Sequence, residues 1–316
     1  MADVYMHAKL AKEVISELGK DVQDNLLTLG AQGPDPMYYG FVHSYHDRYK
    51  FIADRMHDTE TNKLFKSFLS YIKDHPSNEV YSYMAGFLCH FALDVSIHPY
   101  VYYKVGQYKK EDPSTHHMRG LHLKFERSID AALIEYDTGK KAHKFPIQPY
   151  TFPTKKPPKE LIDLYQHVMK DRYQFEEGGQ MFMHSVQSMY RVLKYIVRDR
   201  TGLKKQFYKI LNKIFHKEDM FFSDLSMFHH LEDYDYLNQT NTSWLHPATK
   251  EKFYKSVFDL YLDAKDLAKD LIQYLDAYIQ GQENKSIEEV FQNLSFNSGI
   301  DCADKRPMMH YNIYRK

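Results

Sequence analysis

The segment that most restricts the fold is residues 86–100, GFLCHFALDVSIHPY, an apolar run interrupted by three ionisable side chains. His90, Asp94 and His98 follow one another at intervals of four residues, so on a helix they fall within an arc of about 80°. A buried ionisable group without a partner costs several kcal/mol, so each of them needs an opposite charge, a hydrogen bond or a metal ion. The segment therefore predicts a core helix that carries a polar cluster.

This triplet is more specific than a single pair of histidine and acid. Pairs in which an acidic residue follows a histidine by four positions occur about twice as often as chance predicts, so one pair carries little weight. The triplet histidine, acid, histidine at the same spacing is expected only about 0.14 times in a chain of this composition. We therefore favour metal ligation by His90, Asp94 and His98 over a structural hydrogen-bond network. For a further pair, His122 and Glu126, the two interpretations are equally favoured.

The rest of the chain has the pattern of an all-helical protein. Apolar residues recur at positions i, i+3, i+4 and i+7, alternating β-branched runs are few, and the 316 residues include only 13 glycines. The size allows one large domain or two modest ones. The predicted helices cover residues 3–18, 59–74, 79–98, 117–137, 159–170, 181–199, 203–215, 248–280 and 286–293.

One change of composition divides the chain. The stretch FPIQPYTFPTKKPP has five prolines from Pro146 to Pro158, which predicts an extended connection because proline cannot continue a helix. We divide the chain into a metal-binding helical core at 1–145, a Pro-rich crossover at 146–158 and a helical remainder at 159–316. Helical bundles carry such crossovers, so we expect the remainder to pack in the same domain as the core.

Charge and cysteine content restrict the partners and the compartment. The chain has 42 basic and 42 acidic residues, which argues against binding nucleic acid or an anionic membrane through bulk charge, and lysine pairs such as Lys204 with Lys205 are interpreted as solvated surface. The only cysteines are Cys89 and Cys302, and the N-terminal pattern is that of an amphipathic helix, so we expect a cytoplasmic location. No run approaches 18 apolar residues, so no transmembrane helix is expected.

Four features outside the triplet have a plain structural interpretation beside a functional one. Asp35 stands between two prolines in LGAQGPDPMYYG, either as a carboxylate on stiff backbone or as an ordinary turn residue. His57 precedes a predicted helix start, where a surface histidine is common, and His7 lies beside apolar neighbours, where a satisfied core histidine is common. The segment at 227–247, with His229 and the only Trp, is interpreted as a loop packed over the metal half; a lid over substrate is the alternative.

The order of these residues resembles the ligand series of the zinc-dependent phospholipase C family, which is related to single-strand-specific zinc nucleases. The resemblance covers about residues 3 to 130 and is strongest in the segment GAQGPDP. The matching side chains are His7, Asp35, His57, His90 and Asp94 in HFALD, His98, and His122 and Glu126 in HLKFE.

The resemblance implies an all-helical bundle that holds about two or three zinc ions, or another divalent metal, in a cleft. By this resemblance one ion is bound by Asp35, His57, His90 and Asp94, a second by His7 and Asp94, and a third by His98, His122 and Glu126. Asp94 bridges two ions, and Asp35 is a ligand or a general base; these two are the predicted catalytic residues.

The implied function is that of a zinc-dependent, phospholipase C-like phosphodiesterase in which metal-activated water attacks the phosphate ester of a small molecule or a lipid headgroup. The alternative is a non-catalytic helical protein with structural ions, or a scaffold. Closed protein coordination would favour the alternative, and a coordination position open to water would favour catalysis. A metal-free bundle with histidine hydrogen-bond networks is the third hypothesis.

The chain departs from the family pattern at two places. Secreted members use a processed N-terminal Trp as a ligand beside the first histidine, whereas this chain begins MADVYMH, so Asp3 or water would complete that site. The best-known members place the third-site histidine six residues after the bridging aspartate, where this chain has Tyr100. Two alternatives would supply the third-site histidine: a shifted helix end would let His98 reach the site, or His116 or His117 would replace it.

Overall fold

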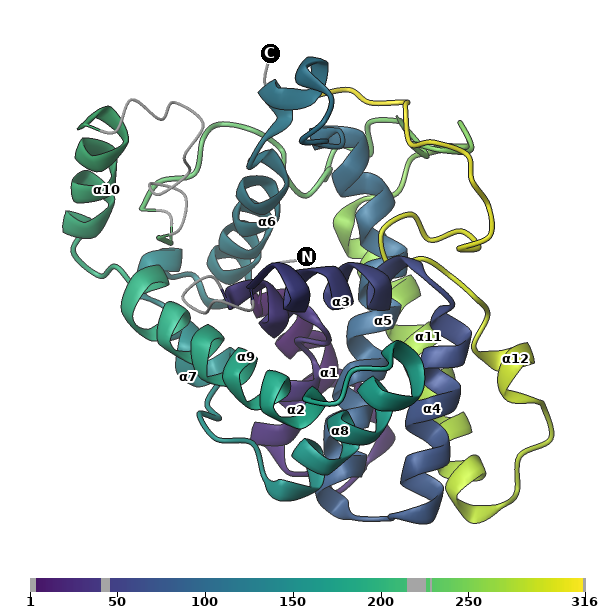
Figure 1. Ribbon diagram of the computed structural model, residues 1–316. Coiled ribbons are helices and arrows are strands. Elements are labelled where there is room, and N and C mark those ends of the chain that lie inside the picture. The colour runs from purple at the N-terminus through teal and green to yellow at the C-terminus, as the bar shows by residue number, and fades with distance from the viewer. Residues whose placement is uncertain (1–3, 41–45, 215–225, 228, 315–316) are drawn as a thin grey trace.

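The computed structural model describes residues 4–40, 46–214, 226–227 and 229–314, and this part of the chain is almost entirely helical (Figure 1). The first half contains α1 (Val4–Leu18), α2 (Asp24–Gly30), α3 (His46–Asp58), α4 (Thr61–Asp74), α5 (Asn78–Val105) and α6 (Leu121–Thr138). The second half contains α7 (Ile147–Thr151), α8 (Lys159–Tyr173), α9 (Gly178–Val192), α10 (Leu203–Ile214), α11 (Val257–Gln280) and α12 (Ile287–Val290).

Short elements join these helices. They are the 3-10 turns η1 (Asp35–Tyr39), η2 (Pro113–Met118) and η3 (Ala142–Lys144), the π-helical turn η4 (Leu193–Val197), and the antiparallel pair β1 (Trp244–Leu245) and β2 (Lys252–Phe253). The all-α prediction is confirmed.

Helix α5 is the axis of the molecule. It contacts α1, α2, α6, α8 and α11, and Figure 1 shows it passing through the middle of the bundle. The Ser77 side chain caps its first turn by accepting the Val80 amide, and Gly106, with φ of 70°, ends it. By length and composition α5 is apolar enough to cross a membrane, but 83% of its most apolar window is buried inside the fold, as in the core helix of a soluble bundle.

Helix α5 is longer than predicted, because it continues through Pro99 to Val105. The prediction ended it at His98, since an interior proline costs about 3 kcal/mol. The turn after Pro99 buries Tyr100, Val101 and Val105, and this burial outweighs the lost hydrogen bond.

Other boundaries also differ from the prediction. Helix α11 begins at Val257 and not at 248, because Ser256 and Asp259 form a capping box there and the preceding residues form the β pair. Helix α7 lies within the Pro-rich crossover, so this connection is not wholly extended. Helices α2 and α3 were not predicted: α2 has only seven residues, and α3 is rich in charged side chains.

Helices from both sides of the crossover pack on the same core. From the second half, α8 contacts α4 and α5, and α11 contacts α1, α4 and α5. The chain after α12 then returns along the C-terminal half of α5, yellow in Figure 1, where the backbone of Asn312 donates to the Tyr103 carbonyl. The division into three parts at 146 and 158 stays a prediction.

The segment at 227–247, of which Phe228 lies outside the described residues, makes packing contacts. The buried Trp244 ring lies 5.6 Å from that of Tyr100 on α5, and His246 Nε2 lies 2.8 Å from the Ser298 carbonyl. These contacts support the interpretation as a structural loop.

Candidate metal centre

The eight predicted ligands come from five elements that meet around the middle of α5. Three groups have ligand atoms that all lie within 4.8 Å of one another: His7, His90 and Asp94; Asp35, His57 and His90; His98, His122 and Glu126. Residues far apart in the chain thus converge on the triplet of α5, and His90 belongs to two of the groups.

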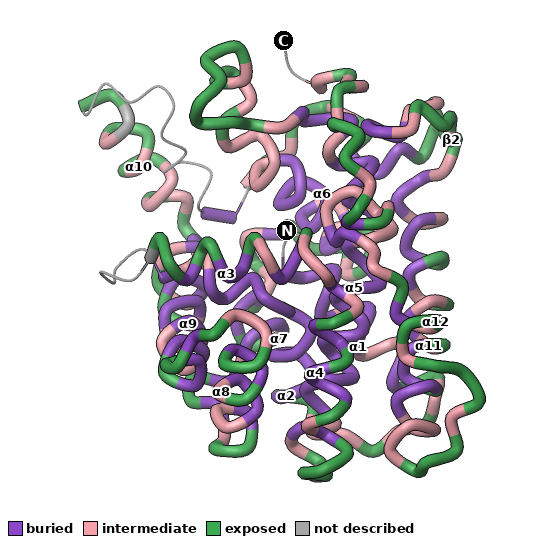
Figure 2. Tube along the Cα trace, turned by 45° about the vertical axis from the view of Figure 1, so that its right-hand side comes forward, coloured by how far each residue is buried: buried purple, intermediate pink, exposed green. Residues whose placement is uncertain are grey.

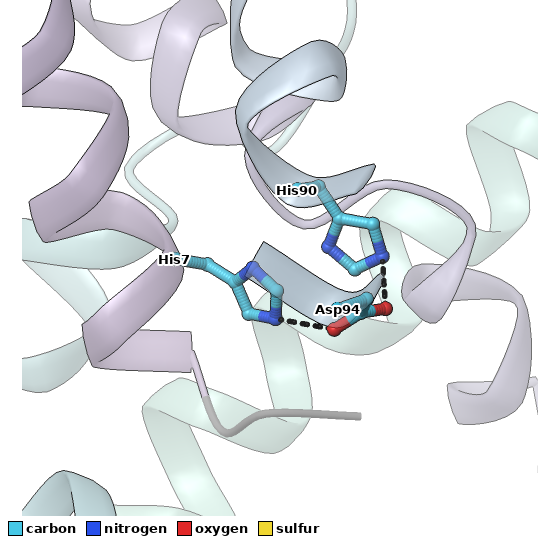
Figure 3. A group of neighbouring side chains, drawn as sticks. All are labelled: His7, His90 and Asp94. Carbon is cyan, nitrogen blue, oxygen red and sulfur yellow. Dashed lines mark ion pairs between the residues drawn. The ribbon is translucent and has the colours of Figure 1, made fainter. Parts of the chain in front are cut away.

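The first group lies where α1 crosses α5 (Figure 3). The Asp94 carboxylate faces two imidazoles, with Oδ1 3.4 Å from His7 Nε2 and Oδ2 3.0 Å from His90 Nε2. The two rings stack with their centroids 4.3 Å apart, and all three side chains are fully buried. This group offers two imidazole nitrogens and a carboxylate, which are donor types that zinc binds.

The second group depends on the loop between α2 and η1. Asp35 begins η1, flanked by Pro34 and Pro36, and its Oδ1 lies 3.4 Å from Nε2 of His57 on α3. Gly33 has φ of 51°, and a Cβ there would come within 2.2 Å of the His90 ring. The GAQGPDP segment therefore needs glycine at this position for its backbone conformation and for the room that the imidazole occupies.

The third group joins α5 to α6. Glu126 Oε1 lies 2.8 Å from His122 Nε2 and 3.1 Å from His98 Nε2, and His98 Nε2 also lies 3.4 Å from Asp94 Oδ1. His98 reaches this group from the interior of a continuous helix, so no shifted helix end is involved. His116 lies in η2 with its Nε2 3.1 Å from the Lys110 carbonyl, and it does not replace His98.

Backbone carbonyls orient three of the imidazoles. Nδ1 of His57 lies 2.7 Å from the Ala53 carbonyl, and Nδ1 of His90 lies 3.2 Å from the Ala31 carbonyl. Nδ1 of His98 lies 2.7 Å from the Phe296 carbonyl. A carbonyl only accepts, so the tautomer that this bond selects carries its proton on Nδ1 and presents a lone pair at Nε2.

These lone pairs face carboxylate oxygens, which also carry lone pairs, so each nitrogen–oxygen pair needs a proton or a metal ion between its two atoms. Within the described part of the chain, several buried donor atoms of the centre have no hydrogen-bond partner: both ring nitrogens of His7, Nε2 of His57 and His90, Oδ1 of Asp35 and both carboxylate oxygens of Asp94. Imidazole nitrogen and carboxylate oxygen are zinc ligands. The residues present therefore fit a zinc centre.

Electrostatics keep His7 and Asp94 in the form that binds a metal. Burial lowers the pKa of His7 well below its usual range. Burial alone raises the pKa of Asp94, but His90 and His98 beside it hold this pKa well below its usual range. His57 is the exception: burial lowers its pKa, but Asp35 raises it, with a net increase. Metal binding at the second group therefore competes with proton binding at His57.

Glu126 and His122 behave like the first group. Burial lowers the pKa of His122; burial raises that of Glu126, but the charge of His122 brings it below its usual range. The His122 side chain is 26% exposed, whereas the ligand-type side chains of the first group are fully buried. The centre therefore opens to solvent at its third group, on the side of α6.

Phe296, in the C-terminal half, supports the centre and was missed by the sequence analysis. Its amide donates to the His57 carbonyl at 2.8 Å, and its carbonyl orients His98. Its ring packs against His57 at 5.2 Å and His90 at 5.9 Å between centroids. Backbone contacts between distant segments leave no pattern in a sequence, so no signal pointed to this residue. Asp3, the predicted completion of the His7 site, lies outside the described residues.

Comparison with known proteins gives one match. A family model described as zinc dependent phospholipase C matches residues 6–179, more than half of the chain, and this range contains all eight side chains of the three groups. No curated protein and no solved structure matches.

Proposed function

The chain belongs to the zinc-dependent phospholipase C family, and from this premise we propose that it is a zinc-dependent hydrolase of phosphate esters. The observation that supports this most directly is the orientation of His57, His90 and His98, whose Nδ1 atoms face carbonyls while their Nε2 atoms face the carboxylates of the centre. Hydrogen bonds from the other ring nitrogen to a carbonyl are typical of zinc-binding histidines, because they fix the tautomer and the ring direction.

We propose that each of the three groups holds one ion. In this assignment Asp94 serves more than one ion, since its carboxylate faces His7, His90 and His98 at once, at 3.0 to 3.4 Å. When bound, zinc supplies Lewis acidity that polarises a phosphoryl oxygen and lowers the pKa of water toward 7.

The side chains of the centre would orient the reactants and move the proton. Asp35 Oδ1 has no hydrogen-bond partner among the described residues and lies 3.4 Å from His57 Nε2, so it is available to accept a proton from water. Asp94, held ionised by His90 and His98, keeps the negative charge that balances cations in a buried site. Asp35 and Asp94 are therefore the proposed catalytic residues.

The proposed substrate is a phosphodiester that enters from the side of His122. The first group is fully buried, and the partly exposed His122 gives the third group contact with solvent. A lipid headgroup or a small soluble phosphodiester presents the same phosphoryl group to this opening. We retain the cytoplasm as the proposed location, because Cys89 and Cys302 are both free thiols, which a reducing compartment preserves.

The test is metal content followed by turnover. Protein purified without an affinity tag or added zinc is dialysed and its metals are measured by elemental analysis. It is then assayed at neutral pH on p-nitrophenyl phosphorylcholine, bis(p-nitrophenyl) phosphate and p-nitrophenyl phosphate. We expect zinc at more than one ion per chain and hydrolysis of a diester. If the protein takes up no zinc on titration, the side chains of the centre form a hydrogen-bond network and not a metal site.

A non-catalytic protein with structural ions is the second candidate, and the complete burial of His7, His90 and Asp94 favours it. Structural zinc sites are closed by four protein ligands, whereas catalytic sites keep a position for water. Stoichiometric zinc that resists chelation, together with no turnover of any ester, would support this candidate and contradict the hydrolase.

A further inference from the structure

Helix α10 exposes an apolar strip. It stands at the edge of the molecule, away from the central helices, in both views (Figures 1 and 2). Leu203, Phe207, Ile210 and Ile214 are 70%, 56%, 53% and 62% exposed. At 100° per residue these four side chains fall within an arc of about 60°, so they form one continuous strip along the helix. No other helix in the described part of the chain exposes more than one large hydrophobic side chain.

The strip lies in a strongly basic segment of a chain that is neutral as a whole. Residues 191–214 contain eight Arg or Lys residues and one acid, Asp199, whereas the complete chain has 42 of each sign. Asp199 is buried and accepts hydrogen bonds from the backbone amides of Gly202 and Lys205 at the start of α10. Its charge therefore does not neutralise the basic residues on the surface. Lys209 and Lys213 are exposed on one side of the helix, at about 130° and 90° from the centre of the strip. The equal totals of basic and acidic residues in the whole chain therefore do not reveal the positive charge of this segment.

A polar cavity opens at the base of the same helix. Its volume is about 370 Å³, and its lining includes Lys205, Lys209, His229 and His230. Two lysines and two histidines around a space of this size suit a phosphate-containing headgroup. Lys205 and Lys209 project more than about 100° away from the centre of the strip, so the cavity adds positive charge to the polar side of the same helix.

Polar contacts hold α10 to the body of the protein. The Lys204 ammonium donates to the Tyr195 and Arg198 carbonyls at 2.7 and 2.6 Å, and His229 Nε2 lies 2.8 Å from the Asp199 carbonyl. Lys204 is therefore not simply solvated surface, as the sequence suggested. Both views place α10 at the same end of the molecule as α6, the helix that carries His122.

We propose that α10 is an interfacial helix that docks the protein on an anionic phospholipid bilayer. Leu203, Phe207, Ile210 and Ile214 enter the boundary between headgroups and acyl chains, and Lys209 and Lys213 contact anionic headgroups beside them. Amphipathic helices with a basic flank and an apolar face bind bilayers in this way, lying in the plane of the interface.

The test is co-sedimentation of the full chain with vesicles of phosphatidylcholine containing phosphatidylserine, compared with pure phosphatidylcholine. The variant is F207Q/I210Q, which removes the centre of the strip on an exposed surface. The matched control is Leu262→Gln, which changes a side chain on α11 that is 56% exposed. We expect wild type and the control to bind anionic vesicles equally, and F207Q/I210Q to bind at least ten-fold more weakly. Lys209→Glu with Lys213→Glu should weaken binding to the anionic vesicles and reduce its dependence on salt.

Three outcomes overturn the docking proposal. The first two are no binding of the wild type to anionic vesicles and equal binding by wild type and F207Q/I210Q. If sedimentation velocity shows instead that wild type is a dimer which F207Q/I210Q converts to a monomer, a second copy covers the strip and the proposal is wrong. Turnover of soluble p-nitrophenyl phosphorylcholine, measured without vesicles, tests the proposed function independently of membrane docking. An enzyme that hydrolyses the soluble ester but does not bind vesicles contradicts the docking alone, and a vesicle-binding protein without turnover contradicts the hydrolase alone.

Discussion

Replacing Asp94 by Asn tests the metal centre with the smallest change of shape. Asn has the size of Asp but no charge, and Asp94 is fully buried with three imidazoles at 3.0 to 3.4 Å. In the absence of zinc the variant loses the attraction between Asp94 and its histidines, which costs about 1 to 3 kcal/mol of unfolding free energy. In the presence of zinc it also loses the stabilisation that the bound ions provide.

The excess loss in zinc can be calculated from binding linkage. A ligand at about 1,000 times its dissociation constant stabilises the folded state by about 4 kcal/mol, and a variant that cannot bind loses all of it. For a chain of 316 residues, each kcal/mol moves Tm by about 1.5 °C, so the zinc-dependent part of the change is about 6 °C. This difference does not depend on what the substitution costs without metal.

The assay is thermal unfolding of wild type and variant, each in zinc and in chelator. The control is Asp259→Asn, the same chemical change at the capping box of α11, which should cost about 1 kcal/mol in both conditions. We expect the zinc-dependent shift of Tm to disappear in Asp94→Asn and to persist in Asp259→Asn. An equal shift in both variants would refute the assignment of Asp94 as a shared ligand.

Three further predictions follow from the structure. Gly33→Ala should lower zinc content and Tm, because the new methyl group would meet the His90 imidazole at 2.2 Å. Gly139→Ala, with φ of 65° and no atom within 4 Å of the new Cβ, should cost only about 1 to 2 kcal/mol; elemental analysis and thermal unfolding compare the two variants. In chelator, the free energy of unfolding should fall as pH decreases below 6.5, because the lowered pKa of His7 in the folded state means that the unfolded state binds more protons. The raised pKa of His57 has the opposite effect and offsets part of this fall; urea titrations between pH 8 and 5 measure the free energy of unfolding. His229→Ala should leave the zinc content unchanged by elemental analysis, because its contacts are to Asp199 and not to the centre.

Each of these predictions has a contrary outcome. Full zinc content in Gly33→Ala would mean that the loop before η1 can move without disturbing His90. A free energy of unfolding that stays constant or rises toward pH 5 in chelator would mean that His57, and not His7, dominates the titration. Loss of an ion in His229→Ala would place a ligand outside the first 130 residues.

The sequence determined those features that depend on the chain's local geometry. His90, Asp94 and His98 share a face because a helix repeats every 3.6 residues, and this holds wherever the helix packs. The apolar periodicity predicted α1, α4, α5, α6, α8 and α10 to within a few residues at most boundaries. The order of the remaining ligand-type residues could be matched to a family, and the family match covers them.

The tertiary structure decided which distant groups meet and which surfaces stay uncovered. His7, Asp35 and His57 lie on separate elements, and only the packing of α1, η1 and α3 on α5 brings their atoms together. The burial of residues after Pro99 carries α5 past the residue that was expected to end it, and the backbone of Phe296 reaches His57 and His98 from the other half of the chain. The apolar face of α10 has the same period as that of a core helix, so its exposure could not be read from the residues. Periodicity says which side chains share a face, and only the arrangement of the other helices determines whether that face is covered.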